Sequence, residues 1–292
     1  MTHPIRIDLH VHTTASDGQF SPMEVVRLAR DRRLNYLAIT DHDTTDGVTE
    51  AQAAAQVSAD HPELANPIVI PGIELSAEDV DGDVHMLGYY LHIDNTALQT
   101  RLSKFRQDRA ERARKMVEKL NGLGMEITFE RVLEIAAGSG KRRGAIGRPH
   151  VARAMIEKGY ADSIPDAFNR YLNPGAPGYV ARERLSPEGA IALIHESGGA
   201  AVLAHPAKLK DYHAMIKRLA AVGLDGVEVV HPSSDERTRL DLRGLAAQHN
   251  LLMTGGSDFH NTAEDGSLSI GSLTPPEDAP RLLKERAARY ST

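Results

Sequence analysis

The stretch IRIDLHVHTTASDG, residues 5–18, decides the fold of this chain. Its first half alternates apolar and polar residues as a short buried strand does, and His10 and His12 stand two residues apart at the end of that strand. Side chains at i and i+2 of a strand point to the same face, so both imidazoles can bind one ion from one side. Asp17 follows closely. A single H-x-H pair is weak evidence for a metal site, so the hypothesis requires further ligands elsewhere.

Six further apolar runs predict strands, and His, Asp or Glu follows or interrupts each of them. In a parallel sheet or barrel the carboxyl ends of the strands meet in one cleft, so these polar groups are predicted to gather there. Converging carboxylates repel one another unless cations neutralise them, which predicts a metal centre. The seven predicted strands lie near residues 5–11, 35–40, 67–73, 84–91, 200–204, 226–231 and 251–254. The polar groups of the six later runs are Asp41 with His42, Glu74, His85, His205, His231, and Asp258 with His260.

Each of these residues also has a plainer interpretation. Asp17 is compatible with a turn, because Asp-Gly is a favoured turn pair. His42 or a neighbouring Asp is compatible with a helix cap, and Asp258 with an N-cap. Glu74 could simply end a strand, and His205 could be a hydrogen-bonded core histidine. The joint placement of all these groups, rather than any one of them, favours the metal centre.

Helical patterns separate most of the predicted strands. Ser21-Pro22-Met23-Glu24 is a capping box with Pro at the first helical position, and Ser186-Pro187-Glu188 opens a second helix that Gly198 closes. Alternating strands and helices predict an α/β fold, with a parallel sheet covered by helices. Seven strands favour a closed or distorted barrel. No GxGxxG or GxxxxGK[ST] loop follows a predicted strand, so a Rossmann or P-loop nucleotide site is not expected.

The alternation breaks between the fourth and fifth strands, where the pattern is helical. We predict a barrel of residues 1–99 and 181–292, and an α-helical insert of residues 100–180 that caps the barrel mouth. The helices of the insert are predicted near residues 96–121 and 128–137, from Pro149 onward, and near residues 163–172, with a flexible basic loop at residues 138–144.

Composition restricts the chemistry. Hydrophobic residues make up 41% of the chain and charged residues 25%, as in ordinary soluble proteins. The chain has no Cys, which excludes disulfides, zinc fingers and thiol catalysis. Imidazole and carboxylate ligands suit Mn²⁺, Fe²⁺ or Zn²⁺. No signal peptide or membrane span is predicted, so we expect a cytoplasmic enzyme with no obligate protein partner.

Charge is distributed unevenly along the chain. The net charge is −6, yet residues 101–148 carry 13 Lys and Arg against 6 Asp and Glu. A basic module on an acidic body favours an anionic ligand, including one with more than one phosphate. The alternative is a solvated amphipathic helix over residues 101–120, and the sequence leaves both open.

Six motifs now show a resemblance: HVHTTASDGQFSP, ITDHD, PGIE, HMLGY, LAHP and GGSDFH, in this order. Together they resemble the signature of the PHP (polymerase and histidinol phosphatase) family of phosphoesterases. The resemblance implies a distorted (β/α)₇ barrel with two or three divalent metal ions, Mn²⁺ first among them, at its mouth. It implies catalytic roles for Asp17, His42, His205 and His260. The ligands it implies are His10, His12, Asp17, His42, Glu74, His85, His205, Asp258 and His260.

By analogy with that family, three groups of ligands are expected. One ion would be held by His10, His12, Glu74 and Asp258. Glu74 would bridge to a second ion held by His85 and His205, and Asp17, His42 and His260 would serve a third. A metal-bridging hydroxide would then attack phosphorus in line, and a histidine at the mouth would protonate the leaving hydroxyl.

The insert motif GRPHVARAM, residues 147–155, resembles the branch of the family that acts on nucleotides. We therefore predict a phosphomonoesterase that removes the 3′-phosphate of nucleoside 3′,5′-bisphosphates such as 3′-phosphoadenosine 5′-phosphate. The alternatives are a 5′→3′ exoribonuclease on short 5′-phosphorylated RNA and a nucleotide-binding module without turnover. Predicted substrate contacts are Arg148, His150 and His231, although Arg148 and His150 also fit a plain helix start and His231 could simply pack beside Pro232. Only 4% of the chain is aromatic, so the insert offers few platforms for stacking bases: Phe105, Phe129, Phe168 and Tyr171.

Overall fold

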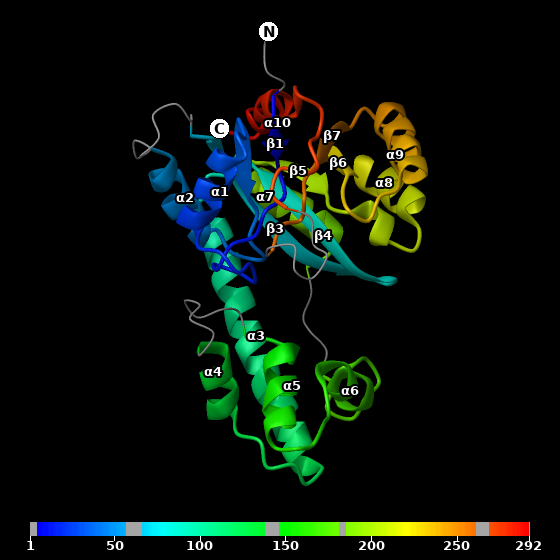
Figure 1. Ribbon diagram of the computed structural model, residues 1–292. Helices are drawn as coiled ribbons and strands as arrows, with labels where there is room; N and C mark the ends of the chain where they lie inside the picture. Colours follow the sequence, from blue (N-terminus) through cyan, green and yellow to red (C-terminus); the bar gives the residue numbers. More distant parts are fainter. Residues whose placement is uncertain (1–4, 57–65, 138–145, 181–184, 261–268, 292) are drawn as a thin grey trace. The chain divides into compact units, whose positions relative to one another are not determined.

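The computed structural model describes residues 5–56, 66–137, 146–180, 185–260 and 269–291, and every structural statement below concerns these residues. The chain divides into two compact units, which we call the barrel unit (residues 1–99 and 185–292) and the helical unit (residues 100–184) (Figure 1). The predicted basic loop at residues 138–144 lies outside the described residues. Whether the helical unit caps the barrel mouth stays a prediction.

The barrel unit alternates strands with helices, as its apolar periodicity predicts. Helix α1 (Pro22–Asp31) begins with the predicted capping box: Ser21 accepts a hydrogen bond from the Glu24 amide, and the Glu24 side chain accepts one from the Ser21 amide. The strands are β1 (Ile7–Asp8), β2 (Tyr36–Ile39), β3 (Ile68–Asp79), β4 (Gly82–Tyr89), β5 (Ala200–Leu203), β6 (Gly226–Val230) and β7 (Leu252–Gly255). The helices are α1 (Pro22–Asp31), α2 (Asp46–Gln56), α7 (Pro187–Glu196), the 3₁₀ turn η2 (Pro206–Lys208), α8 (Tyr212–Ala220), α9 (Glu236–Gln248) and α10 (Ala279–Ala287).

The seven strands form one sheet in the order β1 to β7, and this sheet is nearly closed. Beyond the short β1, Val11 pairs with Phe259 in a parallel bridge. The His12 amide donates to the Phe259 carbonyl at 2.9 Å, and the Leu9 amide donates to the Gly255 carbonyl at 3.3 Å. These bonds join the first strand to the last, so the predicted seven-stranded α/β barrel is confirmed.

The expectation of an all-parallel sheet is wrong at β4. Strands β3 and β4 form an antiparallel hairpin, and β4 also pairs antiparallel with β5. The turn between them is only residues 80–81, too short for the crossover that parallel neighbours require. His85 therefore reaches the site from the first half of β4, opposite Ser76 of β3, and not from a carboxyl end.

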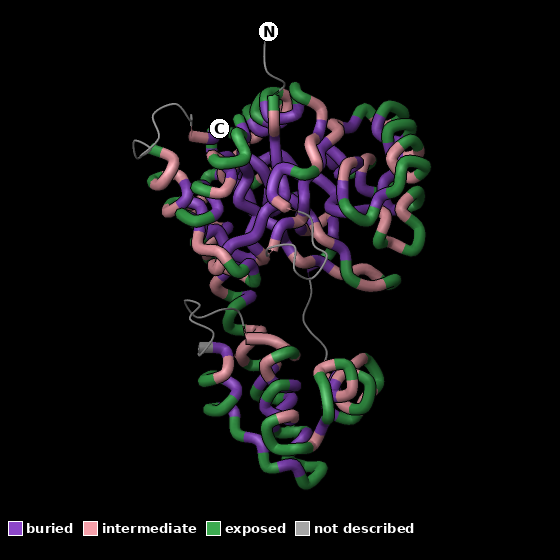
Figure 2. Tube along the Cα trace, viewed as in Figure 1, coloured by how far each residue is buried: buried purple, intermediate pink, exposed green. Residues whose placement is uncertain are grey.

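Many residues along the strands of the barrel unit are buried (Figure 2). Among the described residues of this unit, apolar side chains pack in two clusters. One cluster fills the barrel with strand residues and receives α10 through Ala279, Leu283 and Ala287. The other packs α1 and α2 against β2 and the start of β3. Burial of the apolar side chains in these two clusters stabilises the closed barrel.

The helical unit has a core of its own, formed by residues such as Met116, Leu120, Val132 and Met155. Its elements are α3 (Thr96–Gly122, which begins in the barrel unit), α4 (Phe129–Ala137), α5 (Arg148–Glu157), α6 (Ile164–Ala167) and the π-helix η1 (Phe168–Leu172). Within the described ranges, none of the helices combines the length and apolarity that a bilayer crossing requires.

Candidate metal centre

The loops and strands at one end of the barrel bring the predicted ligands together. His10 and His12 follow β1, His42 follows β2, and Glu74 lies within β3, with His42 and Glu74 paired in a parallel bridge. The later ligands come from the other half of the barrel: His85 in β4, His205 after β5, and Asp258 with His260 after β7. His205 and Asp258 have φ angles of 28° and 52°, an uncommon left-handed conformation for residues other than glycine.

Glu74 stands at the centre of the site, and its side chain is 1% exposed. One carboxylate oxygen, Oε1, lies 2.8 Å from His85 Nδ1 and 3.0 Å from His205 Nε2. The other oxygen, Oε2, lies within 3.3 Å of three further rings, those of His10, His12 and His42. One carboxylate thus faces two sets of imidazoles, one set on each oxygen, as a ligand shared by two cations would.

Asp258, which is half-buried, forms the second junction of the site. Its Oδ1 lies 3.4 Å from His10 Nε2 and 3.3 Å from His12 Nε2. Its Oδ2 lies 3.2 Å from His231 Nε2 and 3.3 Å from the Lys208 ammonium. One oxygen of Asp258 therefore faces the rings of His10 and His12, which Glu74 also faces, and the other oxygen faces His231 and Lys208.

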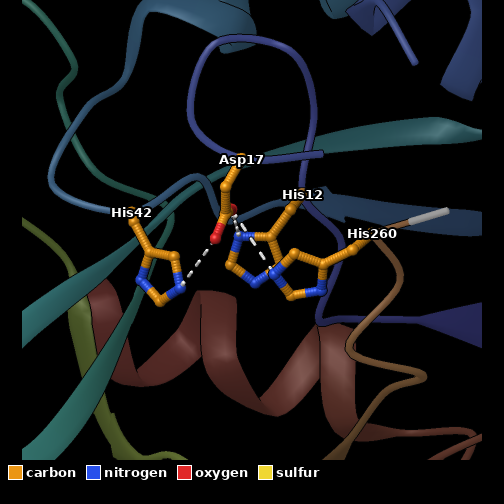
Figure 3. Close-up of side chains that lie close together, drawn as sticks. All are labelled: His12, Asp17, His42 and His260. Carbon is orange, nitrogen blue, oxygen red and sulfur yellow. Dashed lines mark ion pairs between the residues drawn. The ribbon is translucent and has the colours of Figure 1, made fainter. Parts of the chain in front are cut away.

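The outer part of the site is more exposed. Asp17 points between three rings: His260 at 3.4 Å, His12 at 3.7 Å and His42 at 3.9 Å (Figure 3). The Asp17 side chain is 55% exposed, whereas His12 is fully buried. The exposure of the side chains therefore rises from the buried interior of the centre to its rim, where water and substrate can enter.

Electrostatics couple these groups strongly. Burial alone would raise the pKa of Glu74, but the surrounding imidazoles, His42 and His10 first, hold it well below its usual range. Burial lowers the pKa of His12, but Asp258 and Glu74 outweigh it and raise that pKa to about 10. His42 differs, since burial dominates there and lowers its pKa to about 4. In the metal-free protein, protons on some imidazoles thus balance the carboxylates.

The arrangement fits divalent metal ions. Among the described residues, the buried Nδ1 and Nε2 of His12, Nδ1 of His42 and Nδ1 of His205 have no hydrogen-bond partner. His12 Nε2 and His42 Nδ1 lie within 3.3 Å of Glu74 Oε2 without making a hydrogen bond to it, which is the spacing of two ligand atoms that share a metal ion. The donor set is nitrogen and oxygen only, which suits Mn²⁺, Fe²⁺ or Zn²⁺.

Within the part of the chain that the structure describes, four groups of side chains have ligand atoms within 4.8 Å of one another. The group of His10, His12, Glu74 and Asp258 is the same as one expected group. The group of Asp17, His42 and His260 was also expected, and here His12 joins it. In the expected group of Glu74, His85 and His205, His42 takes the place of His205. The fourth group was not expected. The groups are His10, His12, Glu74 and Asp258; His12, Asp17, His42 and His260; His42, Glu74 and His85; and His10, Glu228 and His231.

Known proteins with this arrangement can now be compared. The PHP domain family matches residues 8–174, more than half of the chain. This chain belongs to the PHP family. A 5′-3′ exoribonuclease Rnm of Salmonella typhimurium is 37% identical over 87% of this chain and 84% of its own. A 3′,5′-nucleoside bisphosphate phosphatase of Chromobacterium violaceum is 35% identical over 95% of this chain and 94% of its own.

Solved structures agree with the PHP assignment. A Bifidobacterium adolescentis protein, provisionally assigned as a metal-dependent phosphoesterase, has 31% identity, a TM-score of 0.77 and 98% coverage of both chains. A C. violaceum protein described as an amidohydrolase, with bound sulfate and no metal, has 32% identity, a TM-score of 0.75 and 96% coverage of both chains. The predicted family, PHP, and the predicted enzyme class, a hydrolase of phosphate esters, are confirmed.

Sequence reasoning about this PHP domain missed three charged residues near the centre. Glu228 in β6 is fully buried and contacts His10, and Asp8 of β1 is fully buried and accepts from Ser257. Both residues interrupt apolar strands. A carboxylate within an apolar strand could have indicated a buried, functional position. Lys208 lies in the turn after LAHP, where nothing in the sequence pattern pointed to the site.

The remaining predicted residues have other settings. In the PHP barrel, the His231 ring is buried between Ser233 and Asp258, a setting that orients Asp258. In the helical unit, Arg148 begins α5 and its guanidinium lies 5.2 Å from the Phe168 ring centre, while His150 Nδ1 accepts from the amide of Gly147. Their contact with substrate stays a prediction.

Proposed function

We propose that this PHP protein is a phosphomonoesterase that removes the 3′-phosphate of nucleoside 3′,5′-bisphosphates with two or three divalent cations, Mn²⁺ first. The observation that carries the metal-dependent reaction is Glu74, which faces five imidazoles with its two oxygens. When bound, the cations would supply Lewis acidity for ionising water and for neutralising phosphoryl charge. All nine ligand positions carry competent side chains, which argues against a binding module without turnover.

The residues of the chain have separate tasks in this reaction. His10, His12, Glu74 and Asp258 would hold cations in the dry interior, where electrostatic stabilisation of the phosphoryl group is strongest. Asp17, at the open rim, would hold and orient the rings of His42 and His260 where substrate and water arrive. The sulfate bound by the C. violaceum structure supports a site for a tetrahedral anion in this fold.

Lys208 is a candidate contact for the reacting phosphate. Its ammonium lies 3.3 Å from Asp258, and half of its side chain is exposed. A cation held at a site carboxylate can turn to a phosphate oxygen once the carboxylate is engaged by metal. A charge-assisted hydrogen bond of this kind stabilises charge that develops on the transferred group.

The bisphosphate substrate is supported by the relative that spans nearly the full length of both chains. A property of the helical unit supports a mononucleotide over a long RNA. Of the four rings predicted as stacking platforms, Phe105 and Phe129 are buried. The other two, Phe168 and Tyr171, have the guanidinium groups of Arg148 and Arg170 at 5.2 and 4.8 Å from the ring centre. Bases of a long single strand could not reach the buried rings and would have to displace these two guanidinium groups.

The second candidate is a 5′→3′ exoribonuclease on short RNA, favoured by the 37% identical relative. The test is phosphate and nucleotide release with Mn²⁺ from three substrates: a nucleoside 3′,5′-bisphosphate, a 5′-monophosphate and a 5′-phosphorylated oligoribonucleotide. We expect the bisphosphate to react fastest, because a second phosphate provides remote binding energy. Faster cleavage of the oligoribonucleotide would replace the proposal with the second candidate.

Variants assign the residues within this test. Arg148→Ala is expected to reduce turnover of the bisphosphate far more than that of a simple monophosphate. Arg170→Ala is the matched control, because Arg170 also stacks on a ring of the helical unit but was not predicted to contact substrate. Asp17→Asn and His42→Ala should remove most activity on every substrate while the fold is kept. Full activity in either variant would exclude that residue from the site.

A further inference from the structure

Glu228 is a buried carboxylate that the proposed reaction does not use. It lies in β6, its side chain is 0% exposed, and its two oxygens have different partners. Oε1 lies 2.9 Å from Nδ1 of His10, and Oε2 accepts a hydrogen bond of 2.7 Å from the backbone amide of His205. One carboxylate thus contacts two predicted ligands that come from opposite halves of the sequence.

The first contact fixes the orientation of the His10 ring. A carboxylate can only accept, so Nδ1 of His10 carries the proton in this bond. The opposite nitrogen, Nε2, then faces Glu74 at 3.2 Å and Asp258 at 3.4 Å. Carboxylates that accept from the far nitrogen of a metal-binding histidine fix both its tautomer and its ring plane.

The second contact holds a strained turn of the backbone. His205 has a φ of 28°, a conformation that costs free energy and persists only when its surroundings enforce it. Strand β6 carries an irregularity in its pairing with β7 between Glu228 and Val230. Such bulges redirect side chains next to functional sites.

We propose that Glu228 is a positioning residue of the metal centre: it orients His10 through its ring and His205 through its backbone, and so raises the affinity of the chain for divalent cations. This inference rests on the metal centre of the proposed function and is independent of the substrate. A buried carboxylate beside a histidine could instead serve stability alone, so the test must separate metal affinity from folding.

Asp225, just before β6, provides a matched control. It is also buried, lies 2.8 Å from a ring nitrogen of His195, and accepts a hydrogen bond of 2.9 Å from the Ala201 amide of β5. Asp225, just before β6, and Glu228, in the middle of β6, therefore make the same two kinds of contact. Asp225 contacts no predicted metal ligand among the described residues.

The experiment titrates Mn²⁺ alone into chelator-treated wild type, Glu228→Gln and Asp225→Asn, and records thermal unfolding of each metal-free protein. The introduced amide can accept from only one of the two donors, and its NH₂ group then opposes the other. We expect Glu228→Gln to weaken Mn²⁺ binding about 10- to 100-fold. Asp225→Asn should lower the unfolding temperature without changing Mn²⁺ affinity. With Mn²⁺ raised to saturation, Glu228→Gln should recover most of the wild-type kcat.

Equal Mn²⁺ affinity in wild type and Glu228→Gln would overturn the inference, as would equal losses of affinity in both variants. If Glu228→Gln does not fold, Glu228→Asp replaces it: the charge is kept, but the shorter side chain cannot reach both partners. An unchanged Mn²⁺ affinity in Glu228→Asp would then overturn the inference. A wild type that binds no divalent cation would refute the proposed function itself, which is a different result.

Discussion

Close approach of two strands at Gly256 predicts a large effect of a single methyl group. Gly256 follows β7, and its amide donates to the Val230 carbonyl at 2.9 Å. A Cβ built there would lie 2.5 Å from the His10 Cβ and 2.8 Å from Asp8 Oδ1, and closer still to the His10 amide nitrogen. Carbon atoms pack at about 3.5 to 4 Å, so these atoms would have to separate by about 1 Å.

Gly256→Ala should therefore destabilise the protein by about 1 to 3 kcal/mol, the usual cost of overpacking a tight interior. Gly244→Ala is the matched control. Gly244 lies exposed in the middle of α9, and a Cβ there would meet nothing within 4 Å. Alanine is the better helix former, so this variant should gain about 0.5 to 1 kcal/mol.

Urea unfolding of the metal-free proteins measures both free energies, and thermal unfolding should show about 2 to 4 °C per kcal/mol for a domain of this size. Because the displaced atoms belong to His10, Gly256→Ala should also weaken Mn²⁺ binding, whereas Gly244→Ala should not. A Gly256→Ala variant as stable as wild type would refute the reasoning. So would a loss of stability of the same size in both variants.

Three further outcomes are expected. Lys208→Ala should lower kcat/KM for phosphate release about 10- to 100-fold, because it removes one charge-assisted hydrogen bond to the phosphate. Lys210→Ala, at an exposed neighbouring lysine, should leave kcat/KM unchanged. Equal effects of the two substitutions would exclude Lys208 as a phosphate contact. The carboxylates raise the pKa of His12 to about 10, so Mn²⁺ must displace a proton from this ring when it binds. The affinity for Mn²⁺ should therefore rise with pH, and calorimetry in two buffers of different ionisation enthalpy should detect the released proton. Binding heats that do not depend on the buffer would contradict this prediction. Ser21→Ala removes the capping box shared with Glu24 and should cost about 1 kcal/mol in urea unfolding, and an unchanged free energy would argue against the cap.

Several ligands could be predicted because local spacing encodes them. His10 and His12 share a face through the two-residue period of a strand, and Asp258 follows an apolar run. Glu74 was expected just after a strand ending at residue 73, but it lies in the middle of the longer β3. Seven such runs predict a barrel, and parallel strands align their carboxyl ends. The helices of the insert could likewise be predicted from Pro149 and from their apolar period.

The direction of β4 could not be predicted from its composition. An apolar strand has the same periodicity whichever way it runs, and the hairpin with β3 depends on a two-residue turn. The contacts of His231 and Arg148 could not be predicted either, because their partners are distant in sequence. The His231 ring contacts Asp258, and the Arg148 guanidinium lies over the ring of Phe168 in η1.

The sequence by itself determined that this chain carries imidazoles and carboxylates within or just after its apolar strands, because strand period and apolar runs are local properties. Only the tertiary structure decided that Glu74 faces five rings at once and that Glu228 lies against His10, 218 residues away along the chain. The physical reason is the closure of the sheet. Hydrogen bonds between the first and last strands bring distant carboxylates and rings into one dry interior, where their charges interact at short range.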